Sequence, residues 1–251
     1  MKDAAATRKG YFLKNQEMIG FFKAYVRISL EPFRHLALKE LEAITNLLRK
    51  FTERAETHSA YLLLEGVGVK NVGSIPTWTS NSELEALLKL GLSSPRNSIA
   101  IEVGSYLGAS TCYLVAGLAK VDGRLFCVDT WQNETMPEGS CDTYSEFLSN
   151  TSSLTPWITI VHKKSCHVCQ DDISGFVDLI FLDGDHSYPA VKEDFLHFSE
   201  WLADDGIIIF HDSKYFSGVI RTIGEALATG NWVIAGNLDN LCWLKRVFDL
   251  K

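Results

Sequence analysis

Beyond residue 98, short apolar runs alternate with segments in which apolar residues recur at helical spacing. The runs predict strands at 99–103, 124–128, 158–161, 178–182 and 206–210. Helical patterns fall between and after them, at 108–120, 142–150, 166–173, 188–203 and 217–229. Strict alternation of strand and helix implies right-handed crossovers, and therefore a parallel, doubly wound sheet with helices on both faces.

The last two apolar runs, 231–236 and 241–248, are separated by only four residues. Such a spacing allows a hairpin and leaves no room for a crossover helix. We therefore expect an α/β fold with a mostly parallel seven-stranded sheet whose last strand is antiparallel.

The apolar pattern of the first hundred residues predicts helices. Apolar residues separated by three or four positions form a stripe that predicts an amphipathic helix. They are Ala37, Leu41, Ile44, Leu48, Phe51 and Ala55. The stripe predicts burial but not the partner, so this helix either packs on the chain's own core or forms a dimer arm. Residues 18–30 are apolar with two basic side chains on one side. For them we favour a buried or interface helix over one lying on a membrane surface.

A third helix is predicted after the Gly-, Ser- and Thr-rich loop 66–80. Ser82 and Glu85 have the spacing of a capping box at its start, and Gly91 can close it. The expected organisation is an N-terminal helical extension or cap over residues 1–98 and a main domain over residues 99–251.

Composition narrows the class of function. Of the 251 residues, 46% are hydrophobic and 22% charged, as in globular proteins, and no apolar stretch is long enough to span a membrane. A net charge of -7 without a Lys- and Arg-rich run argues against a nucleic-acid partner. The start lacks the apolar core of a signal peptide, so we expect a cytoplasmic protein with six free cysteines and a small-molecule substrate.

Polar residues follow four of the predicted strands: EVGSYLGAS at 102–110, VDTW at 128–131, DGDH at 183–186 and HDS at 211–213. Ligands of doubly wound sheets bind outside the carboxyl ends of the strands. Gly104 and Gly108 let the backbone approach a ligand ahead of a helix, with spacing that differs from the G-x-G-x-x-G of dinucleotide sites. Asp129 is placed to accept both hydroxyls of a ribose.

These four motifs, in this order, resemble the class I S-adenosylmethionine-dependent methyltransferases, which have a Rossmann-like fold. The resemblance is strongest to the metal-dependent O-methyltransferases, which include the catechol and caffeoyl-CoA enzymes and the macrocin and mycinamicin sugar O-methyltransferases. It covers residues 99 to about 248, closing hairpin included. The first hundred residues share only a general likeness to the helical cap and lid of these enzymes.

The resemblance implies contacts with S-adenosyl-L-methionine at nine positions. They are Glu102, Gly104, Ser105 and Gly108 at the amino-acid end, Asp129 at the ribose, Trp131 beside it, Ser165 on the adenine side, and Thr79 and Ser80 at the cofactor's carboxylate.

The resemblance also implies a divalent metal held by Asp183, His211 and Asp212. Mg²⁺ is the first expectation, with Mn²⁺ or another ion as the alternative. Many relatives have Asp or Glu at the position of His211, and imidazole suits Zn, Mn or Fe better than Mg²⁺. His211 therefore either ligates a softer metal or does not ligate at all.

His186 stands three residues after Asp183, where relatives place a lysine or histidine base. With Asp183 it forms the expected catalytic pair, because a neutral imidazole can deprotonate a hydroxyl whose pKa a metal has lowered. The alternative to this catalytic role is a structural one, in which His186 is a turn residue that hydrogen-bonds to the backbone. Asp185 either orients His186 or caps the helix that begins near Tyr188.

A second constellation consists of His162, Cys166, His167 and Cys169. Structural zinc sites need a second ligand pair at defined spacing, which does not follow here. The surroundings also differ from those of a thioredoxin-like redox motif. We interpret this segment as a loop and a helix start.

The sequence thus predicts an O-methyltransferase that uses S-adenosylmethionine and a divalent metal on a hydroxylated small molecule, such as a sugar or a natural-product intermediate. The expected assembly is a homo-oligomer formed through the N-terminal helices. Three alternatives stay open: the same fold with a different reaction, a non-catalytic cofactor-binding or scaffold protein, and a dehydrogenase that uses a nicotinamide cofactor. The sequence does not identify the acceptor.

Overall fold

The structure is a computed structural model that describes residues 34–133, 139–173 and 175–247. The helix expected at 18–30 lies outside the described residues. By its internal contacts the chain divides into residues 1–56 and residues 57–251. The predicted division into a helical extension or cap over residues 1–98 and a main domain over residues 99–251 stays a prediction.

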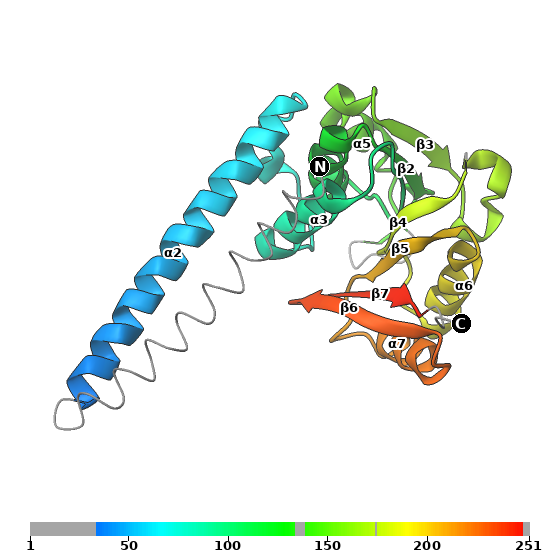
Figure 1. The fold of residues 1–251 in the computed structure, drawn as a ribbon. Coiled ribbons are helices and arrows are strands. Elements are labelled where there is room, and N and C mark those ends of the chain that lie inside the picture. Colours follow the sequence, from blue (N-terminus) through cyan, green and yellow to red (C-terminus); the bar gives the residue numbers. More distant parts are fainter. Residues whose placement is uncertain (1–33, 134–138, 174, 248–251) are drawn as a thin grey trace. The chain divides into compact units, whose positions relative to one another are not determined.

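The sheet has seven strands in the order β3-β2-β1-β4-β5-β7-β6 (Figure 1). Their bounds are Ile99–Val103 for β1, Arg124–Asp129 for β2, Ile158–His162 for β3, Val177–Leu182 for β4, Leu202–Phe210 for β5, Trp232–Leu238 for β6 and Leu241–Arg246 for β7. Neighbours from β3 to β5 pair in parallel, whereas β7 is antiparallel to both β5 and β6. This confirms the predicted Rossmann-like sheet and its antiparallel last strand. The order reverses between β1 and β4, where such folds bind ligands.

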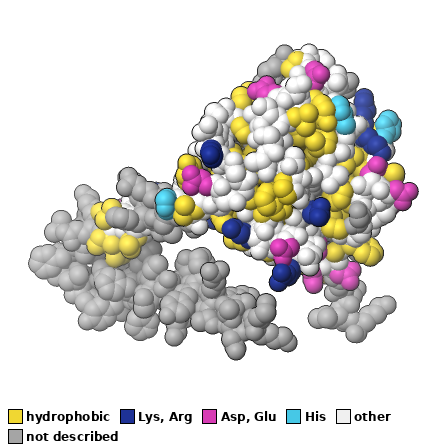
Figure 2. All heavy atoms as spheres, turned by 90° about the horizontal axis from the view of Figure 1, so that it is seen from above, with side chains coloured by type: hydrophobic (Ala, Val, Ile, Leu, Met, Phe, Trp, Pro, Cys, Tyr) yellow, Lys and Arg dark blue, Asp and Glu magenta, His cyan; other side chains and the backbone are white. Residues whose placement is uncertain are grey.

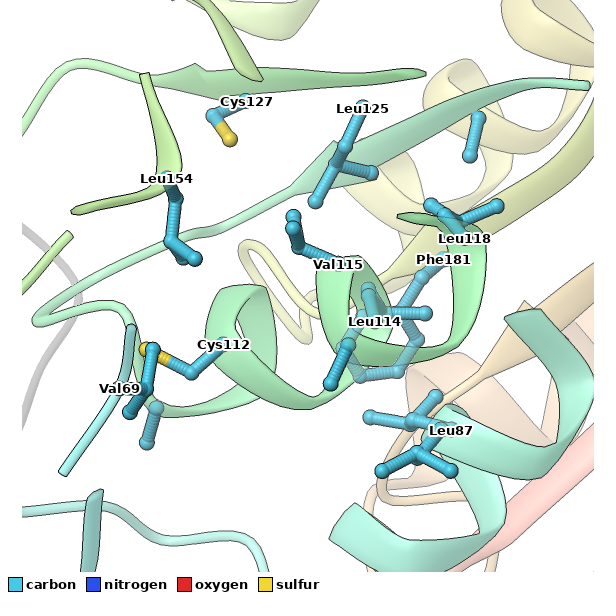
Figure 3. Close-up of a cluster of buried hydrophobic side chains, with 14 of the residues drawn as sticks. Val69, Leu87, Cys112, Leu114, Val115, Leu118, Leu125, Cys127, Leu154 and Phe181 are labelled. Carbon is cyan, nitrogen blue, oxygen red and sulfur yellow. The ribbon is translucent and has the colours of Figure 1, made fainter. Parts of the chain in front are cut away.

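Helices cover both faces of the sheet and bury two apolar clusters. The helices are α3 (Asn81–Ser93), α4 (Ala109–Leu118), α5 (Tyr144–Asn150), α6 (Tyr188–Ser199) and α7 (Ser217–Ala228). Figure 3 shows Leu87 of α3, Leu114 of α4 and Leu125 of β2 gathered in the first cluster. Along β4, Phe181 belongs to the first cluster and Ile180 to the second. Because successive side chains of a strand point to opposite faces, the continuous apolar run of β4 serves both.

The first long helix, α2, spans Arg34–Gly66 and contains the predicted segment 37–55. Within residues 41–49, Ile44 and Leu47 are 53% and 55% exposed. Farther along, Ala60 and Leu64 are buried in the first apolar cluster. No helix of the described part of the chain has the length and apolar character needed to cross a membrane.

Four local predictions are corrected by the structure. The helix predicted at 188–203 ends at Ser199, because β5 begins at Leu202 and not at residue 206. Residues 166–173 do not form a helix; two short 3₁₀ turns, Ser165–His167 and Gln170–Asp172, replace it. In this segment Asp172 bonds the backbone N–H of Cys169 at 2.9 Å and the ammonium group of Lys163 at 2.6 Å, which stabilises turns rather than a helix.

The other two corrections concern α3. Its capping box joins Ser80 to Glu83, two residues before the predicted pair of Ser82 and Glu85. The helix also continues past Gly91 to Ser93. A Cβ atom on Gly91 would lie 2.9 Å from the carbonyl oxygen of Leu114, so this glycine permits close packing of α4 instead of ending the helix.

Candidate functional site

The exits of β1 and β4 touch each other through their backbones. Gly104 has a φ of +89°, and a Cβ atom built on it would lie 2.1 Å from the carbonyl oxygen of Asp183. Only glycine has both the backbone freedom and the absent side chain that this contact requires. The glycine turn and the predicted metal ligand Asp183 are therefore immediate neighbours.

Below this turn, Glu102 is completely buried and bonded by hydroxyls. Its carboxylate accepts from Ser105 Oγ at 2.7 Å, Ser110 Oγ at 2.7 Å and Thr111 Oγ1 at 2.5 Å. Burial raises the pKa of Glu102 to about 7, and these three hydrogen bonds oppose the rise. Glu102 and Ser105 thus support the turn from beneath. Gly108 caps α4 at a φ of +90°, where a Cβ would meet Thr151 at 2.6 Å.

Asp129 ties the exits of β1 and β2 together. Its carboxylate accepts from the backbone N–H groups of Tyr106 at 2.9 Å and Trp131 at 2.7 Å. The indole N–H of Trp131 donates to the carbonyl oxygen of Tyr106 at 3.0 Å. The Trp131 ring is fully buried and packs on Phe147 with ring centres 4.8 Å apart, so it anchors this loop in the core.

The remaining expected cofactor residues lie in two other loops. Ser80 caps α3, and its backbone N–H donates to Glu83 at 2.8 Å; Thr79 beside it is buried. The hydroxyl of Ser165 bonds the buried carboxyl group of Asp194, whose pKa burial raises to about 6. Their contacts with a cofactor stay predictions.

At the exits of β4 and β5 the structure brings two acids and two imidazoles together. Nε2 of His186 lies 3.5 Å from Asp183 Oδ1 and 3.3 Å from Asp212 Oδ2. Nδ1 of His211 lies 3.0 Å from the same oxygen of Asp183 and 3.3 Å from the same oxygen of Asp212. The predicted catalytic and metal-binding residues therefore form one acid-imidazole cluster: Asp183, His186, His211 and Asp212.

Electrostatics within this cluster favour charged groups. Burial acts to lower the pKa of His211, but Asp183 and Asp212 outweigh it and raise that pKa to about 11. Burial similarly acts against His186, whose pKa the two carboxylates still raise. Burial acts to raise the pKa of Asp183, but the two imidazoles have the larger effect, so the pKa is lowered. The two carboxylates therefore favour a positively charged group or ion within the cluster.

The donor set fits a divalent cation. Among the described residues, Nε2 of His186 and both ring nitrogens of His211 are buried without a hydrogen-bond partner in good geometry, although carboxylate oxygens are near. Ligand atoms from Asp183, His186 and Asp212 lie within 4.8 Å of one another. Carboxylates with imidazole suit Mn²⁺, Zn²⁺ or Fe²⁺ well and Mg²⁺ less well.

Asp185 and the cysteine-containing segment make local contacts. Oδ1 of Asp185 accepts from the backbone N–H of Ser187 at 2.8 Å, which supports the helix-start role over one in orienting His186. The thiol of Cys169 donates to Asp172 at 3.1 Å, and Nε2 of His162 lies 2.9 Å from the carbonyl oxygen of Thr130.

Two residues near the cluster were missed by the sequence analysis. Glu83 is buried, and its Oε2 lies 3.6 Å from Nε2 of His211. The spacing of Ser80 and Glu83 also fits a capping box, but the pattern does not distinguish it from Ser82 and Glu85. Phe216 packs against His186 with ring centres 4.3 Å apart, a contact that has no sequence pattern.

Comparisons with known proteins agree with the observed fold. Residues 101–213 match the family model described as a methyltransferase domain. The uncharacterized protein y4gI of Sinorhizobium fredii is 26% identical over 117 residues. That match covers 45% of this chain and 13% of the relative, so the chain spans only a small part of that protein's length.

Similar solved structures share the fold at low identity. A protein assigned as a caffeoyl-CoA O-methyltransferase from Staphylococcus aureus has a TM-score of 0.56 and 15% identity, covering 79% of this chain and 98% of its own. The O-methyltransferase NovP has a TM-score of 0.56 and 12% identity, with 68% and 82% covered. An O-methyltransferase from Bacillus cereus, in complex with SAH, has a TM-score of 0.53 and 16% identity, with 72% and 89% covered.

Proposed function

We propose that the protein is a metal-dependent O-methyltransferase, on the premise that residues 101–213 match the methyltransferase-domain family and that the sheet has the Rossmann-like order of the class I S-adenosylmethionine-dependent methyltransferases. It would transfer the methyl group of S-adenosylmethionine to a hydroxyl group of a small molecule. The observation that carries this proposal is the acid-imidazole cluster at the exits of β4 and β5, beside the Gly104 turn.

The cofactor would occupy the exits of β1 and β2. The backbone of the Gly104 turn can approach the amino-acid end, and the half-buried carboxylate of Asp129 can accept from the ribose hydroxyls. Ser165, Thr79 and Ser80 keep the roles that the family resemblance implies. A neighbour at 16% identity was solved in complex with SAH, which supports a cofactor of this kind by analogy.

Asp183, Asp212 and His211 would hold the metal. A divalent cation there supplies positive charge that favours the ionised form of an acceptor hydroxyl and the neutral form of a nearby imidazole. With the carboxylates of Asp183 and Asp212 engaged by the cation, a neutral His186 would take the hydroxyl proton at Nε2. The protein then has to align the acceptor oxygen with the sulfonium methyl group.

The surroundings of His186 support a small hydroxylated acceptor with a ring, such as a sugar or a natural-product intermediate. Phe216 lies on the His186 ring and is 44% exposed, and Tyr215 beside it is exposed. Both aromatic rings can pack on the face of an acceptor ring. On the face drawn in Figure 2, basic and acidic side chains are scattered among other side chains, which supports a small molecule over a nucleic acid.

We also propose that the protein acts in the cytoplasm as a homo-oligomer. All six cysteines are free thiols, as is usual in a reducing compartment. Ile44, which belongs to the apolar stripe, and the nearby Leu47 are exposed on α2 and support a homo-oligomer over packing of the stripe on the chain's own core.

A thermal-shift panel followed by a methyl-transfer assay tests the function. S-adenosylhomocysteine at about 100 times its Kd should stabilise the protein by about 2.7 kcal/mol, and Mn²⁺ or Mg²⁺ should stabilise it further. Transfer to a hydroxylated acceptor should stop on chelation and in His186→Ala, which should still bind S-adenosylhomocysteine. His167→Ala, which changes an exposed histidine outside the cluster, is the matched control.

Other outcomes would favour the alternatives. Stabilisation by nicotinamide cofactors instead of S-adenosylhomocysteine would indicate a dehydrogenase. Cofactor binding without methyl transfer to any hydroxylated acceptor would indicate a different reaction or a scaffold protein.

A further inference from the structure

Glu83 is a buried carboxylate that the proposed reaction does not use. It lies in the first turn of α3 and is 1% exposed. Its Oε2 accepts from the backbone N–H of Ser80 at 2.8 Å and from Ser80 Oγ at 2.7 Å, and its Oε1 accepts from the backbone N–H of Asn240 at 2.7 Å. A capping box needs only the bonds with Ser80 and can stand at a solvent-exposed helix end. Complete burial of the carboxylate therefore needs another explanation, because burying a charge is costly.

The carboxylate of Glu83 faces the imidazole of His211, which is itself 3% exposed. Oε2 of Glu83 lies 3.6 Å from Nε2 of His211, while Nδ1 of the same ring lies 3.0 Å from Oδ1 of Asp183. The distance to Glu83 is longer than a hydrogen bond, so the attraction in this state is electrostatic. The imidazole thus stands between a helix carboxylate on one side and the acid-imidazole cluster on the other.

This arrangement places a carboxylate beside the ring nitrogen that would carry the proton when the other nitrogen binds a cation. A neutral imidazole has one N–H donor and one nitrogen with a free lone pair. Asp183 and Asp212 lie nearer to Nδ1 than Glu83 lies to Nε2. With a cation bound by these two carboxylates, Nδ1 would turn its lone pair to the cation, the N–H would lie on Nε2, and Glu83 would be the carboxylate that faces it. Histidines that bind metals commonly donate their other N–H to a carboxylate, which fixes both the tautomer and the ring orientation.

We propose that Glu83 is a positioning residue that holds His211 in the Nε2–H tautomer and presents Nδ1 to the cation. This inference rests on the proposed function, since it assumes the divalent metal held by Asp183, Asp212 and His211. It also predicts the metal class: a nitrogen ligand favours Mn²⁺, Co²⁺ or Zn²⁺ over Mg²⁺.

Glu83 also joins three segments around His211. Through Asn240 it binds the turn between β6 and β7, and the carbonyl oxygen of Asn240 accepts from the backbone N–H of Ser213 at 2.9 Å. The hydroxyl of Ser82 donates to Asp239 at 2.5 Å in the same turn. The start of α3, this turn and the exit of β5 are therefore bonded to one another, which keeps the carboxylate and the imidazole in place.

Metal binding by the cofactor-free, full-length protein tests the proposal without any turnover. The Mn²⁺ and Mg²⁺ affinities of the wild type, Glu83→Gln and Glu85→Gln are measured by isothermal titration calorimetry. Glu83→Gln should weaken Mn²⁺ binding by roughly 10- to 100-fold and reduce the preference for Mn²⁺ over Mg²⁺. Glu85→Gln makes the same chemical change on the same helix, where the carboxylate bonds Thr57 Oγ1 at 2.8 Å, and should leave both affinities unchanged.

The outcomes separate this inference from the proposed function. Wild-type Mn²⁺ affinity in Glu83→Gln would overturn the role of Glu83 and leave the proposed metal enzyme intact. A wild type that binds no divalent ion would overturn both. If Glu83→Gln does not fold, NMR correlation of the His211 ring nitrogens in the Zn²⁺-bound wild type replaces it. A proton on Nε2 is expected there, and a proton on Nδ1 would refute the proposal.

Discussion

At the residue scale, Glu102 shows how burial and hydrogen bonding compete within one side chain. Three hydroxyls bond its carboxylate, yet burial still raises its pKa to about 7. In contrast, Asp183 is surrounded by imidazoles, and its pKa is lowered. Two carboxylates on neighbouring strands thus respond to burial in opposite directions because only one of them has cationic partners.

The pKa of Glu102 predicts a pH-dependent stability. Since its folded pKa of about 7 exceeds the ordinary 4.5, its contribution to stability is fully present below pH 4.5 and is lost as the pH rises through about 7. The difference corresponds to roughly 3 kcal/mol. In urea unfolding of the cofactor-free protein, raising the pH from about 5 to about 8 should reduce wild-type stability relative to Glu102→Gln by roughly 2 to 3 kcal/mol. A difference between the two proteins that does not change with pH would contradict this prediction.

At the element scale, close packing of α3 against α4 holds the start of α3 near the site. A Cβ atom on Gly117 of α4 would lie 2.2 Å from the carbonyl oxygen of Leu88 and 2.7 Å from the backbone nitrogen of Leu92. Neither backbone atom can move without displacing the whole helix. The position of Ser80 and Glu83 therefore depends on a glycine in the neighbouring helix.

Gly117→Ala should separate α3 from α4 and destabilise the protein by roughly 1 to 3 kcal/mol. The matched control is Gly224→Ala in the interior of α7, where a Cβ atom meets nothing within 4 Å. Because alanine has the higher helix propensity, the control should stabilise the protein by about 0.5 to 1 kcal/mol. Urea unfolding of both variants measures the two effects, and equal changes in the two variants would refute the packing argument.

The sequence predicts the sheet well because each strand has a strong local pattern. Ile180 and Phe181 lie in a run that is apolar at every position, as a strand covered on both faces requires. Acids placed directly after such runs meet at one edge of the sheet, so the grouping of Asp183 with Asp212 was also predictable.

The errors occur where long-range contacts decide between similar local patterns. Ser80 with Glu83 and Ser82 with Glu85 have the same spacing, and the contacts of Glu83 with Asn240 and His211 distinguish the true pair. Those contacts join positions far apart in the chain. Sequence patterns within one helix contain no information about them.

At the scale of the whole molecule, exposed apolar side chains of α2 are consistent with the proposed association between copies of the chain. Ile44 and Leu47 each expose more than half of their side-chain surface on this helix. Exposed apolar side chains gathered on one helix are typical of interfaces. The proposed homo-oligomer would bury them.

Light scattering coupled to size-exclusion chromatography checks this proposal. The wild type should have the mass of an oligomer, and the double variant Ile44→Glu, Leu47→Glu should have that of a monomer, because charges at these positions would be buried without partners. Leu196→Glu, at a comparably exposed leucine of α6, should leave the mass unchanged. A monomeric wild type would rule out this role for α2.

The bond between Glu83 and Asn240 has a consequence for how the protein is made. The two residues are separated by 157 positions. At ribosomal rates of about 5 to 20 residues per second, Glu83 is synthesised roughly 8 to 30 s before its partner. During translation, strands β1 to β6 are therefore synthesised after Glu83 and before Asn240. The proposed metal site would be complete only after the turn that follows β6 has been synthesised, so any cation that the site holds should bind as one of the last events of folding.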